Sequence, residues 1–268
     1  MKVLAAIFAL LLASVSHAQT SKLRTLDTDY SAASWKAVGR VELGGGRAFC
    51  SGTLIARDLV LTAAHCLYQP GTDQLWPTDT IRFNAGFRNG KAAATRRASD
   101  AAAHDRFDPA GPLTTTNASY DVALVRLSEP VSTFDVPPFY VHDGPIPRGP
   151  VSVVSYGRGR EDTQSRQKEC QLLDRASDAM LFDCDVTFGS SGAPVFTHQN
   201  GRGQIVSVIS GMVRVNGQKR ALGMVLPERV TEVKRQLRLQ VVPPVAKVRR
   251  ITVGGGNRAN TGAKFVRP

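Results

Sequence analysis

The sequence predicts an all-β protein with one helix close to its C-terminal end. Short runs rich in β-branched residues recur along the chain, and glycine or proline separates them, as in barrels and sandwiches. The 268 residues allow either one large or two small all-β domains, so the size of the core is not limiting. The predicted strands cover residues 48–55, 59–61, 81–84, 122–127, 151–155, 195–197 and 204–213.

The predicted helix begins at Pro227. Proline suits the first turn of a helix, and Val230, Val233 and Leu237 then fall on one face at helical spacing. The interval 68–120 is expected to supply surface loops. His104, which lies within this interval, is expected on the surface or in a turn rather than in a catalytic or metal site.

The first 18 residues have the features of a secretory signal peptide. Lys2 supplies the positive start, residues 3–15 form the apolar core, and Ser16-His17-Ala18 matches a small-x-Ala cleavage site. The apolar run is shorter than the roughly 20 residues that span a bilayer. We expect cleavage after Ala18 and a mature protein that is secreted or periplasmic, with no transmembrane segment.

Three segments place a histidine, an aspartate and a serine in distinctive surroundings. They read TAAHC at 62–66, DVALVRL at 121–127 and GSSGAP at 189–194. Alone, each segment has an ordinary interpretation as a packed or solvated histidine, the start of a strand, or a turn. Together they predict nucleophilic catalysis, because a serine needs an imidazole base and the imidazole needs a buried carboxylate.

Each of these residues has a predicted role. We predict Ser191 as the nucleophile, His65 as the general base and Asp121 as the acid that orients the imidazole. Gly189 gives the backbone conformations that few other residues adopt. The amides of Gly189 and Ser191 are therefore predicted to converge on a developing oxyanion.

The order of these motifs resembles the chymotrypsin-like serine protease family over residues 35–238. The likeness is greatest to its bacterial trypsin-like and V8-like branch, and it also includes residues 37–55, 59–66 and 155–157. It implies two packed six-stranded antiparallel β-barrels with the active site between them and a C-terminal α-helix. It further implies a serine endopeptidase that needs no metal or organic cofactor and acts on protein or peptide substrates.

The chain departs from the trypsin branch beside the predicted nucleophile. That branch has an aspartate immediately before the serine, and a new N-terminus of the Ile-Val-Gly-Gly kind pairs with it. Ser190 occupies that position here, and no Ile-Val-Gly-Gly precedes Cys50. We therefore expect local packing or hydrogen bonds to hold the oxyanion loop.

The resemblance also suggests residues that contact the substrate. Ser210 and Gly211 lie in a stretch that resembles the strand pairing with bound substrate. Asp185 is six residues before Ser191, where trypsin-like members carry the aspartate that attracts Arg or Lys side chains. A structural or helix-capping role for Asp185 is the alternative, and V8-like members prefer acidic side chains instead.

Four cysteines in an exported protein predict two disulfides, which can be connected in three ways. Free thiols or a metal site are weaker interpretations, because no CxxC motif or histidine cluster accompanies the cysteines. Cys50 and Cys66 flank the histidine strand as the family's histidine-loop pair does. The resemblance thus implies Cys50–Cys66 and leaves Cys170 with Cys184.

The net charge of +12 is concentrated at the C-terminal end. We divide the mature chain into a leader or propeptide arm (19–34), the protease-like domain (35–238) and a basic tail (239–268). The tail either engages an anionic surface, such as a membrane, a cell-wall polymer or nucleic acid without sequence specificity, or is simply solvated. We expect a monomer.

Two other functions remain open at this level. One is a non-catalytic binding protein on a protease scaffold, whose basic surface engages an anionic partner. The other is an esterase that uses the same three residues, which peptide and ester turnover would separate.

Overall fold

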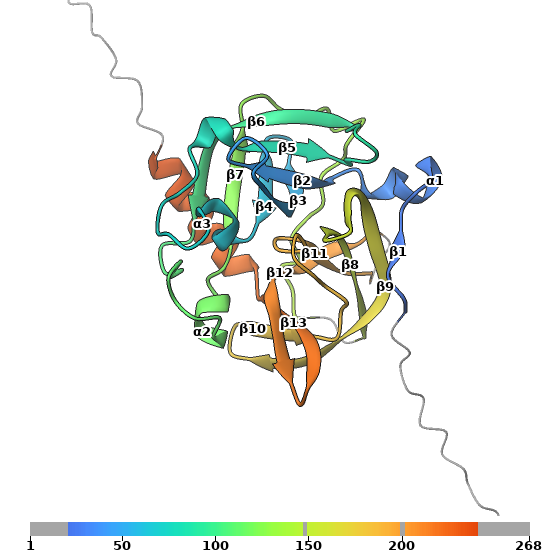
Figure 1. The fold of residues 1–268 in the computed structure, drawn as a ribbon, viewed down its shortest axis with the longest axis vertical. Helices are drawn as coiled ribbons and strands as arrows, with labels where there is room; N and C mark the ends of the chain where they lie inside the picture. Colours follow the sequence, from blue (N-terminus) through green and yellow to red (C-terminus); the bar gives the residue numbers. More distant parts are fainter. Residues whose placement is uncertain (1–20, 147–148, 199–201, 241–268) are drawn as a thin grey trace, which may run out of the picture.

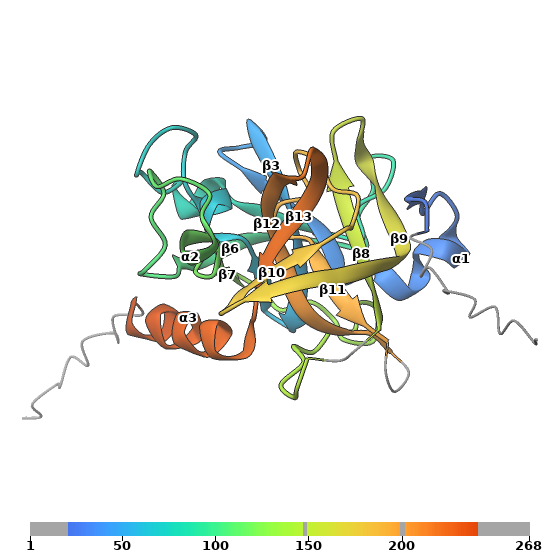
Figure 2. The same cartoon turned by 90° about the horizontal axis from the view of Figure 1, so that it is seen from below.

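The computed structural model describes residues 21–146, 149–198 and 202–240. Two β-barrels lie side by side, and the helix that ends the described chain lies against the first of them (Figures 1 and 2). The signal peptide predicted at 1–18, and all but two residues of the tail predicted at 239–268, lie outside the described residues.

The first barrel is a closed antiparallel ring whose strands follow the order β2-β3-β4-β7-β6-β5. The hairpin that joins its first two strands turns through three consecutive glycines, Gly44, Gly45 and Gly46, all with positive φ. This barrel is built from β2 (Val38–Leu43), β3 (Ala48–Ala56), β4 (Leu59–Thr62), β5 (Arg82–Ala85), β6 (Ala94–Ala103) and β7 (Ala123–Leu127).

The second barrel closes in the order β9-β10-β13-β12-β11-β8, because β8 also pairs with β9. The short strand β1 (Arg24–Thr25) adds to the outside of β9. The predicted fold class, two six-stranded antiparallel barrels with a C-terminal helix, is therefore confirmed. The strands of this barrel are β8 (Pro150–Gly157), β9 (Arg160–Ala176), β10 (Ala179–Phe182), β11 (Pro194–Thr197), β12 (Gln204–Val215) and β13 (Gln218–Met224).

The C-terminal helix α3 (Pro227–Gln240) packs against β6 and β7. Val230, Val233 and Leu237 are its buried apolar residues, which is the face that the sequence predicted. His104 was expected on the surface or in a turn, and it does begin a turn, since the amide of Phe107 donates to its carbonyl at 3.0 Å, but the surface position is wrong. Its side chain is buried, and Nε2 lies 2.7 Å from a carboxylate oxygen of Glu232 on the helix.

A partly buried ionic cluster extends this contact to the second barrel. Arg229 of α3 donates to Glu232 at 2.6 Å and to Asp178 at 2.9 Å. Asp178 lies in the turn between β9 and β10, so one arginine joins the helix to the second barrel. The two barrels also share part of their apolar core. One cluster of buried residues fills the first barrel and continues through Val154 and Phe196 of the second.

Several elements differ from the sequence-based expectation. The interval 68–120 contains β5 and β6, although only a strand at 81–84 was expected there. The strand β9, with 17 residues, was not predicted either. Charged residues recur along both β6 and β9, which hides the apolar alternation that identifies a strand. Short helical segments complete the chain: α1 (Asp29–Ala32), α2 (Thr115–Ala118) and 3₁₀ turns at Ala33–Trp35, Ala64–Leu67 and Thr78–Thr80.

Residues 21–34 pack along the second barrel. The amide of Ser21 donates to the carbonyl of Glu169 at 2.8 Å, and Leu26 and Trp35 are buried. Gln164 donates to the carbonyls of Trp35 and Val38, which fixes the point where the arm enters the first barrel. In the described ranges, no helix is both long enough and apolar enough to cross a membrane.

Candidate active site

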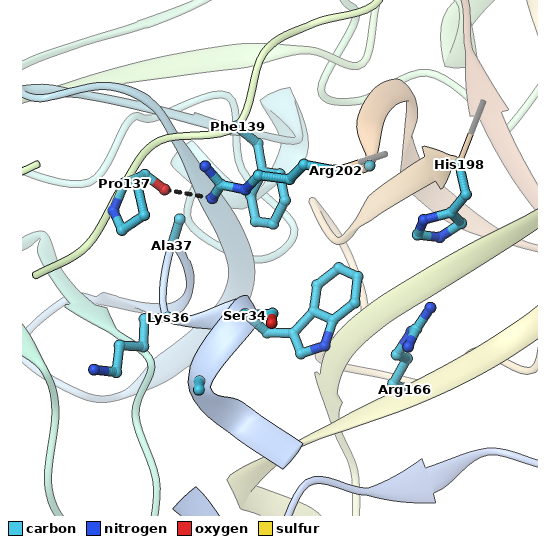
Figure 3. A pocket seen from close by; sticks show the side chains of 11 residues that line it. Ser34, Lys36, Ala37, Pro137, Phe139, Arg166, His198 and Arg202 are labelled. Atoms are coloured by element: carbon cyan, nitrogen blue, oxygen red, sulfur yellow. Dashed lines mark hydrogen bonds between the residues drawn. The ribbon is translucent and has the colours of Figure 1, made fainter. Parts of the chain in front are cut away.

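Two cavities of similar size differ in the chemistry of their walls. One, of about 470 Å³, is lined by Trp35, Phe139, Arg166, His198 and Arg202 among others (Figure 3). Among the described residues that line it there is no carboxylate, and the guanidinium of Arg202 is already bound to the carbonyl of Pro137 at 2.6 Å. Its described lining therefore includes an imidazole, that of His198, but no carboxylate that would orient it.

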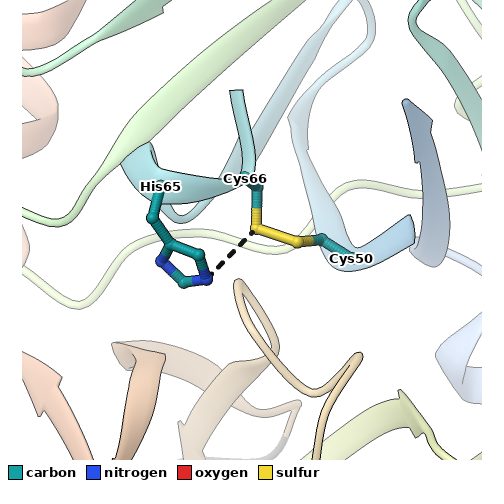
Figure 4. A group of neighbouring side chains, drawn as sticks. All are labelled: Cys50, His65 and Cys66. Atoms are coloured by element: carbon teal, nitrogen blue, oxygen red, sulfur yellow. Dashed lines mark hydrogen bonds between the residues drawn. A yellow bond between two sulfur atoms is a disulfide. The ribbon is translucent and has the colours of Figure 1, made fainter. Parts of the chain in front are cut away.

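The other cavity, of about 420 Å³, brings predicted site residues together. His65, Gly189 and Ser191 all line it, although they come from different barrels. The Cys50–Cys66 disulfide forms part of the same wall, and Nε2 of His65 lies 3.9 Å from Sγ of Cys66 (Figure 4). Both sulfur atoms are in the disulfide, so these cysteines offer no thiolate to a metal ion.

The first barrel positions His65 against Asp121. His65 lies in the 3₁₀ turn that follows β4, and Asp121 lies between α2 and β7. Nδ1 of His65 is 2.7 Å from Oδ2 of Asp121, and the backbone amide of His65 donates to Oδ1 at 2.8 Å. Both carboxylate oxygens therefore bind the same residue, which fixes the imidazole in the tautomer that keeps its proton on Nδ1.

The electrostatic setting of the two groups differs. The side chain of Asp121 is 2% exposed, whereas that of His65 is 38% exposed toward the cavity. Burial alone lowers the pKa of His65, but the charge of Asp121 and its hydrogen bond outweigh burial and raise the pKa above 6.5. The imidazole is thus a stronger base than a free histidine.

Ser210 connects the second barrel to this pair. Its hydroxyl donates to Oδ2 of Asp121 at 2.5 Å. The register of β12 against β13 shifts between Ile209 and Gly211, so Ser210 is an extra residue in its strand. Such a bulge redirects a side chain, and here the hydroxyl reaches the carboxylate. The sequence suggested Ser210 as a substrate contact but gave no sign of its bond to Asp121.

The serine loop, residues 183–193, is shaped by two glycines and anchored by Ser51. Gly189 and Gly192 have φ values of +90° and +75°, which few other residues adopt. The hydroxyl of Ser51 donates to the carbonyl of Gly189 at 2.9 Å, and its amide donates to the carbonyl of Ser191 at 2.8 Å. Sequence reasoning missed Ser51, although its place beside Cys50 was a signal that it lies near the site.

The backbone amides of residues 189–193, in the serine loop, divide into two groups. Those of Ser190, Gly192 and Ala193 donate to backbone carbonyls at 2.7–3.0 Å. In the described part of the chain, the amides of Gly189 and Ser191 donate to no backbone carbonyl. These two donors therefore remain for a bound group. The hydroxyl of Ser191 forms no hydrogen bond with His65 among the described residues, and such bonds often tighten only when substrate binds.

The other predicted residues lie around this centre. Cys170 of β9 is bonded to Cys184, which ties the start of the serine loop to the second barrel. Gly211 faces Leu113, because an added Cβ would lie 3.0 Å from its side chain. Asp185 is exposed and is not among the residues that line the cavity of His65 and Ser191. Its amide donates to Gln167 at 2.7 Å.

Comparison with known proteins places these features in a family. A family model described as a trypsin-like peptidase domain matches residues 50–206. Serine protease 56 from Homo sapiens is 37% identical over 98 residues, which is 37% of this chain and 14% of that protein. Glutamyl endopeptidase from Bacillus licheniformis is 24% identical over 198 residues, which is 72% of this chain and 59% of that protein.

The fold has solved counterparts. The structure of a Glu endopeptidase in complex with MPD superposes with a TM-score of 0.64 at 16% identity, covering 82% of this chain and 98% of that one. The aligned regions span less than two thirds of the length of both curated relatives.

Proposed function

The chain belongs to the trypsin-like peptidase domain family, and from this we propose that it is an exported serine endopeptidase that cuts peptide bonds through an acyl-enzyme intermediate. The observation that carries the proposal is the His65–Asp121 pair, at 2.7 Å, in the wall of a cavity that Ser191 also lines. A buried carboxylate, an oriented imidazole and a serine at one cavity are the parts that acyl transfer requires.

The proposed reaction uses each group in turn. The hydroxyl oxygen of Ser191 attacks the scissile carbonyl carbon while Nε2 of His65 takes its proton. The amides of Gly189 and Ser191 donate to the resulting oxyanion. The imidazolium, stabilised by Asp121, then protonates the leaving amine as the peptide bond breaks. Water enters, gives a proton to His65 and attacks the acyl carbon. The bond from this carbon to the Ser191 oxygen then breaks, and His65 returns the proton to that oxygen, which releases the acid and restores the Ser191 hydroxyl.

Labelling and mutagenesis test this proposal. A fluorophosphonate should label Ser191 in the wild-type protein, and Ser191→Ala should abolish both the label and peptide turnover. His65→Ala should reduce turnover by a similar factor, on the order of a millionfold, because the groups act as one unit. Asp121→Asn should keep the fold and lose roughly ten-thousandfold. A folded wild-type protein that is not labelled would favour the non-catalytic binding protein instead.

The residue on the acyl side of the cut is proposed to be Arg or Lys, on the basis of Asp185. Its carboxylate is exposed, so a substrate cation can approach it. The name of the Bacillus relative favours Glu instead. Cleavage of a peptide library decides between them, because the Asp185 hypothesis requires Arg and Lys cleavage that Asp185→Ser removes while ester turnover continues.

Export to the periplasm or the medium is proposed from the signal-like residues 1–18, and two disulfides support it, because they persist in oxidising compartments. Binding of the basic tail to an anionic surface and a monomeric state are also proposals. Size-exclusion chromatography, with and without anionic vesicles, tests both.

A further inference from the structure

Arg160 directs a guanidinium toward the serine loop from the start of β9. Nη1 donates to the carbonyl of Ser155 at 2.8 Å. Nη2 donates to the hydroxyl of Ser155 at 3.1 Å and to that of Ser190 at 3.2 Å. Among the described residues no carboxylate pairs with this guanidinium, and Asp185 and Glu161 act on it only through longer-range charge interactions. The charge is therefore directed at hydroxyl and carbonyl oxygens.

The hydroxyl of Ser190 is completely buried and fully used. It donates to the carbonyl of Tyr156 at 3.0 Å and accepts from the amide of Thr187 and from Arg160, both at 3.2 Å, while the Ser155 hydroxyl lies farther away, at 3.4 Å. A hydroxyl has one proton to donate and two lone pairs, so these three bonds meet its full capacity. Removal of the guanidinium leaves only the more distant Ser155 hydroxyl, at 3.4 Å, as a substitute donor to this buried acceptor, which weakens this arrangement of the loop.

The position of Ser190 gives this bond its importance. Ser190 lies between Gly189 and Ser191, whose amides donate to no backbone carbonyl in the described chain. The peptide unit that links Ser190 to Ser191 carries one of these amides. Rotation of Ser190 would therefore turn a proposed oxyanion donor away from the cavity.

The backbone leaves space for the guanidinium to reach this point. A Cβ on Gly157 would lie 2.7 Å from Nη2 of Arg160. A Cβ on Gly189 would lie 3.3 Å from the Cα of Gly157, so the turn, the guanidinium and the serine loop are in direct contact. Burial lowers the pKa of Arg160, because the guanidinium has lost part of the water that would solvate its charge.

We propose that Arg160 is a positioning residue that holds the oxyanion loop through Ser190, in place of the ion pair that a newly cut N-terminus forms in the trypsin branch. The inference rests on the proposed serine endopeptidase activity. A charge-assisted hydrogen bond from a guanidinium is stronger than one between neutral groups, so it can maintain the loop without a carboxylate at position 190.

The test compares Arg160→Met with Arg166→Met. Arg166 lies on the same strand and is also half-buried, but it stacks on Trp35 at 4.5 Å and, within the part of the chain that the structure describes, forms no hydrogen bond or ion pair with the serine loop. Arg160→Met should lower kcat on the order of a hundredfold, as loss of one oxyanion donor does, with little change in KM. Arg166→Met should stay within about threefold of wild type, and Arg160→Lys should recover part of the loss.

Two readouts separate positioning from general destabilisation. A peptide boronate, which forms a tetrahedral adduct with serine, should bind Arg160→Met more weakly by the same factor as the fall in kcat/KM, whereas a product peptide should bind unchanged. The low-field NMR signal of the His65–Asp121 proton should persist in this variant. Equal losses for boronate and product, or wild-type kcat in Arg160→Met, would overturn the proposal.

Ser190 variants provide a second check, on the coupling between Ser190 and Arg160, and Ser190→Ala and Ser190→Asp are also measured with Arg160 intact. Ser190→Ala keeps the cation and removes its partner, so its effect should not add to that of Arg160→Met. Ser190→Asp should retain activity beside Arg160 and lose it in Arg160→Met, where the carboxylate has no partner. Additive effects would contradict the coupling. Failure of the proposed function is distinct, since Ser191 of the wild-type protein would then take no fluorophosphonate.

Discussion

Oδ2 of Asp121 accepts hydrogen bonds from His65 and from Ser210, so the two donors share one oxygen. The more of its charge that Ser210 takes up, the less remains for the imidazolium. A residue of the opposite barrel therefore competes with His65 for the carboxylate that raises the pKa of the imidazole.

This sharing makes the acid side of the pH–rate profile predictable. Neutral His65 is the active form, and its pKa lies above 6.5, so kcat/KM should rise with pH through a midpoint above 6.5. Ser210→Ala should move this midpoint to higher pH, because Asp121 then stabilises the imidazolium more strongly. Asp121→Asn should move it to lower pH, because only the effect of burial remains.

The control is Ser207→Ala on the same strand. Ser207 is also buried, but its hydroxyl accepts from the amide of Met224 and is not bonded to Asp121. Its loss should lower stability and leave the midpoint in place. A midpoint that moves downward in Ser210→Ala would refute the shared-acceptor argument.

Among the elements, the serine loop shows how closely the two barrels approach. A Cβ on Gly192 would lie 2.2 Å from Oγ1 of Thr62 and 2.3 Å from the carbonyl oxygen of Ser51, both of the first barrel. Its φ of +75° is nearly that of Gly217, at +76°, where an added Cβ meets nothing within 4 Å. Comparing substitutions at Gly192 and Gly217 therefore separates the cost of backbone strain from the cost of steric crowding.

Gly217→Ala should cost about 1 kcal/mol of unfolding free energy, from the backbone conformation alone. Gly192→Ala should cost about 1–3 kcal/mol more, because overpacking adds to the same strain, and it should also abolish turnover. Urea unfolding and peptide hydrolysis measure the two effects. Similar losses of stability in both variants would show that the barrels tolerate separation at this point.

The packing of α3 against the first barrel should weaken at low pH. Burial raises the pKa of Glu232, but its bonds to His104 and Arg229 outweigh burial and bring the pKa below 4.5. A carboxylate with a depressed pKa contributes stability above its unfolded value, and the protein loses this stability as the pH falls through the folded value. Unfolding free energy measured from about pH 5 to pH 3 should therefore fall less steeply in Glu232→Gln than in wild type.

Glu228→Gln is the matched control on the same helix, because Glu228 is exposed and forms no salt bridge with a described residue. Its slope should equal that of the wild-type protein. If Glu232→Gln keeps the wild-type slope as well, the ionic cluster does not contribute to acid stability.

Features were predictable from the sequence where the interacting residues are close together along the chain, and were missed where these residues are far apart. His65, Asp121 and Ser191 each sit in a local motif, so their setting is visible in a few neighbouring residues. The bonds that orient them are not local: Ser51 reaches Gly189 across 138 positions, and Ser210 reaches Asp121 across 89. The burial of His104 was missed for the same reason, since its partner Glu232 is 128 positions away.

At the scale of the whole molecule, we expect turnover not to depend on which residue begins the chain. The arm at 21–34 packs along the second barrel, and Ser190 is anchored by residues near it. Proteins that begin at residue 19, 20 or 21, and an N-acetylated form of the last, should have equal kcat/KM, because Ser190 is already held by Arg160, Tyr156 and Thr187. Deletion through Leu26 should lower the melting temperature, because it removes β1 and a buried side chain.

Strict dependence of turnover on one N-terminal residue, measured with the same peptide substrate, would reject this independence. It would also reveal an anchor for the serine loop other than Arg160. A loss of turnover that simply follows the loss of thermal stability would not contradict it.

Closure of both barrels also affects where a peptidase with this fold can be cut by other copies of itself. Endopeptidases bind their substrates as extended chain, so every strand with an unpaired edge is a potential site of self-digestion. Within the described residues, each strand of the two rings is paired on both sides, and only the two-residue β1 has an open edge. We therefore expect the paired strands to resist cleavage by neighbouring molecules of the same protein, so that any self-digestion falls in the exposed loops between the strands.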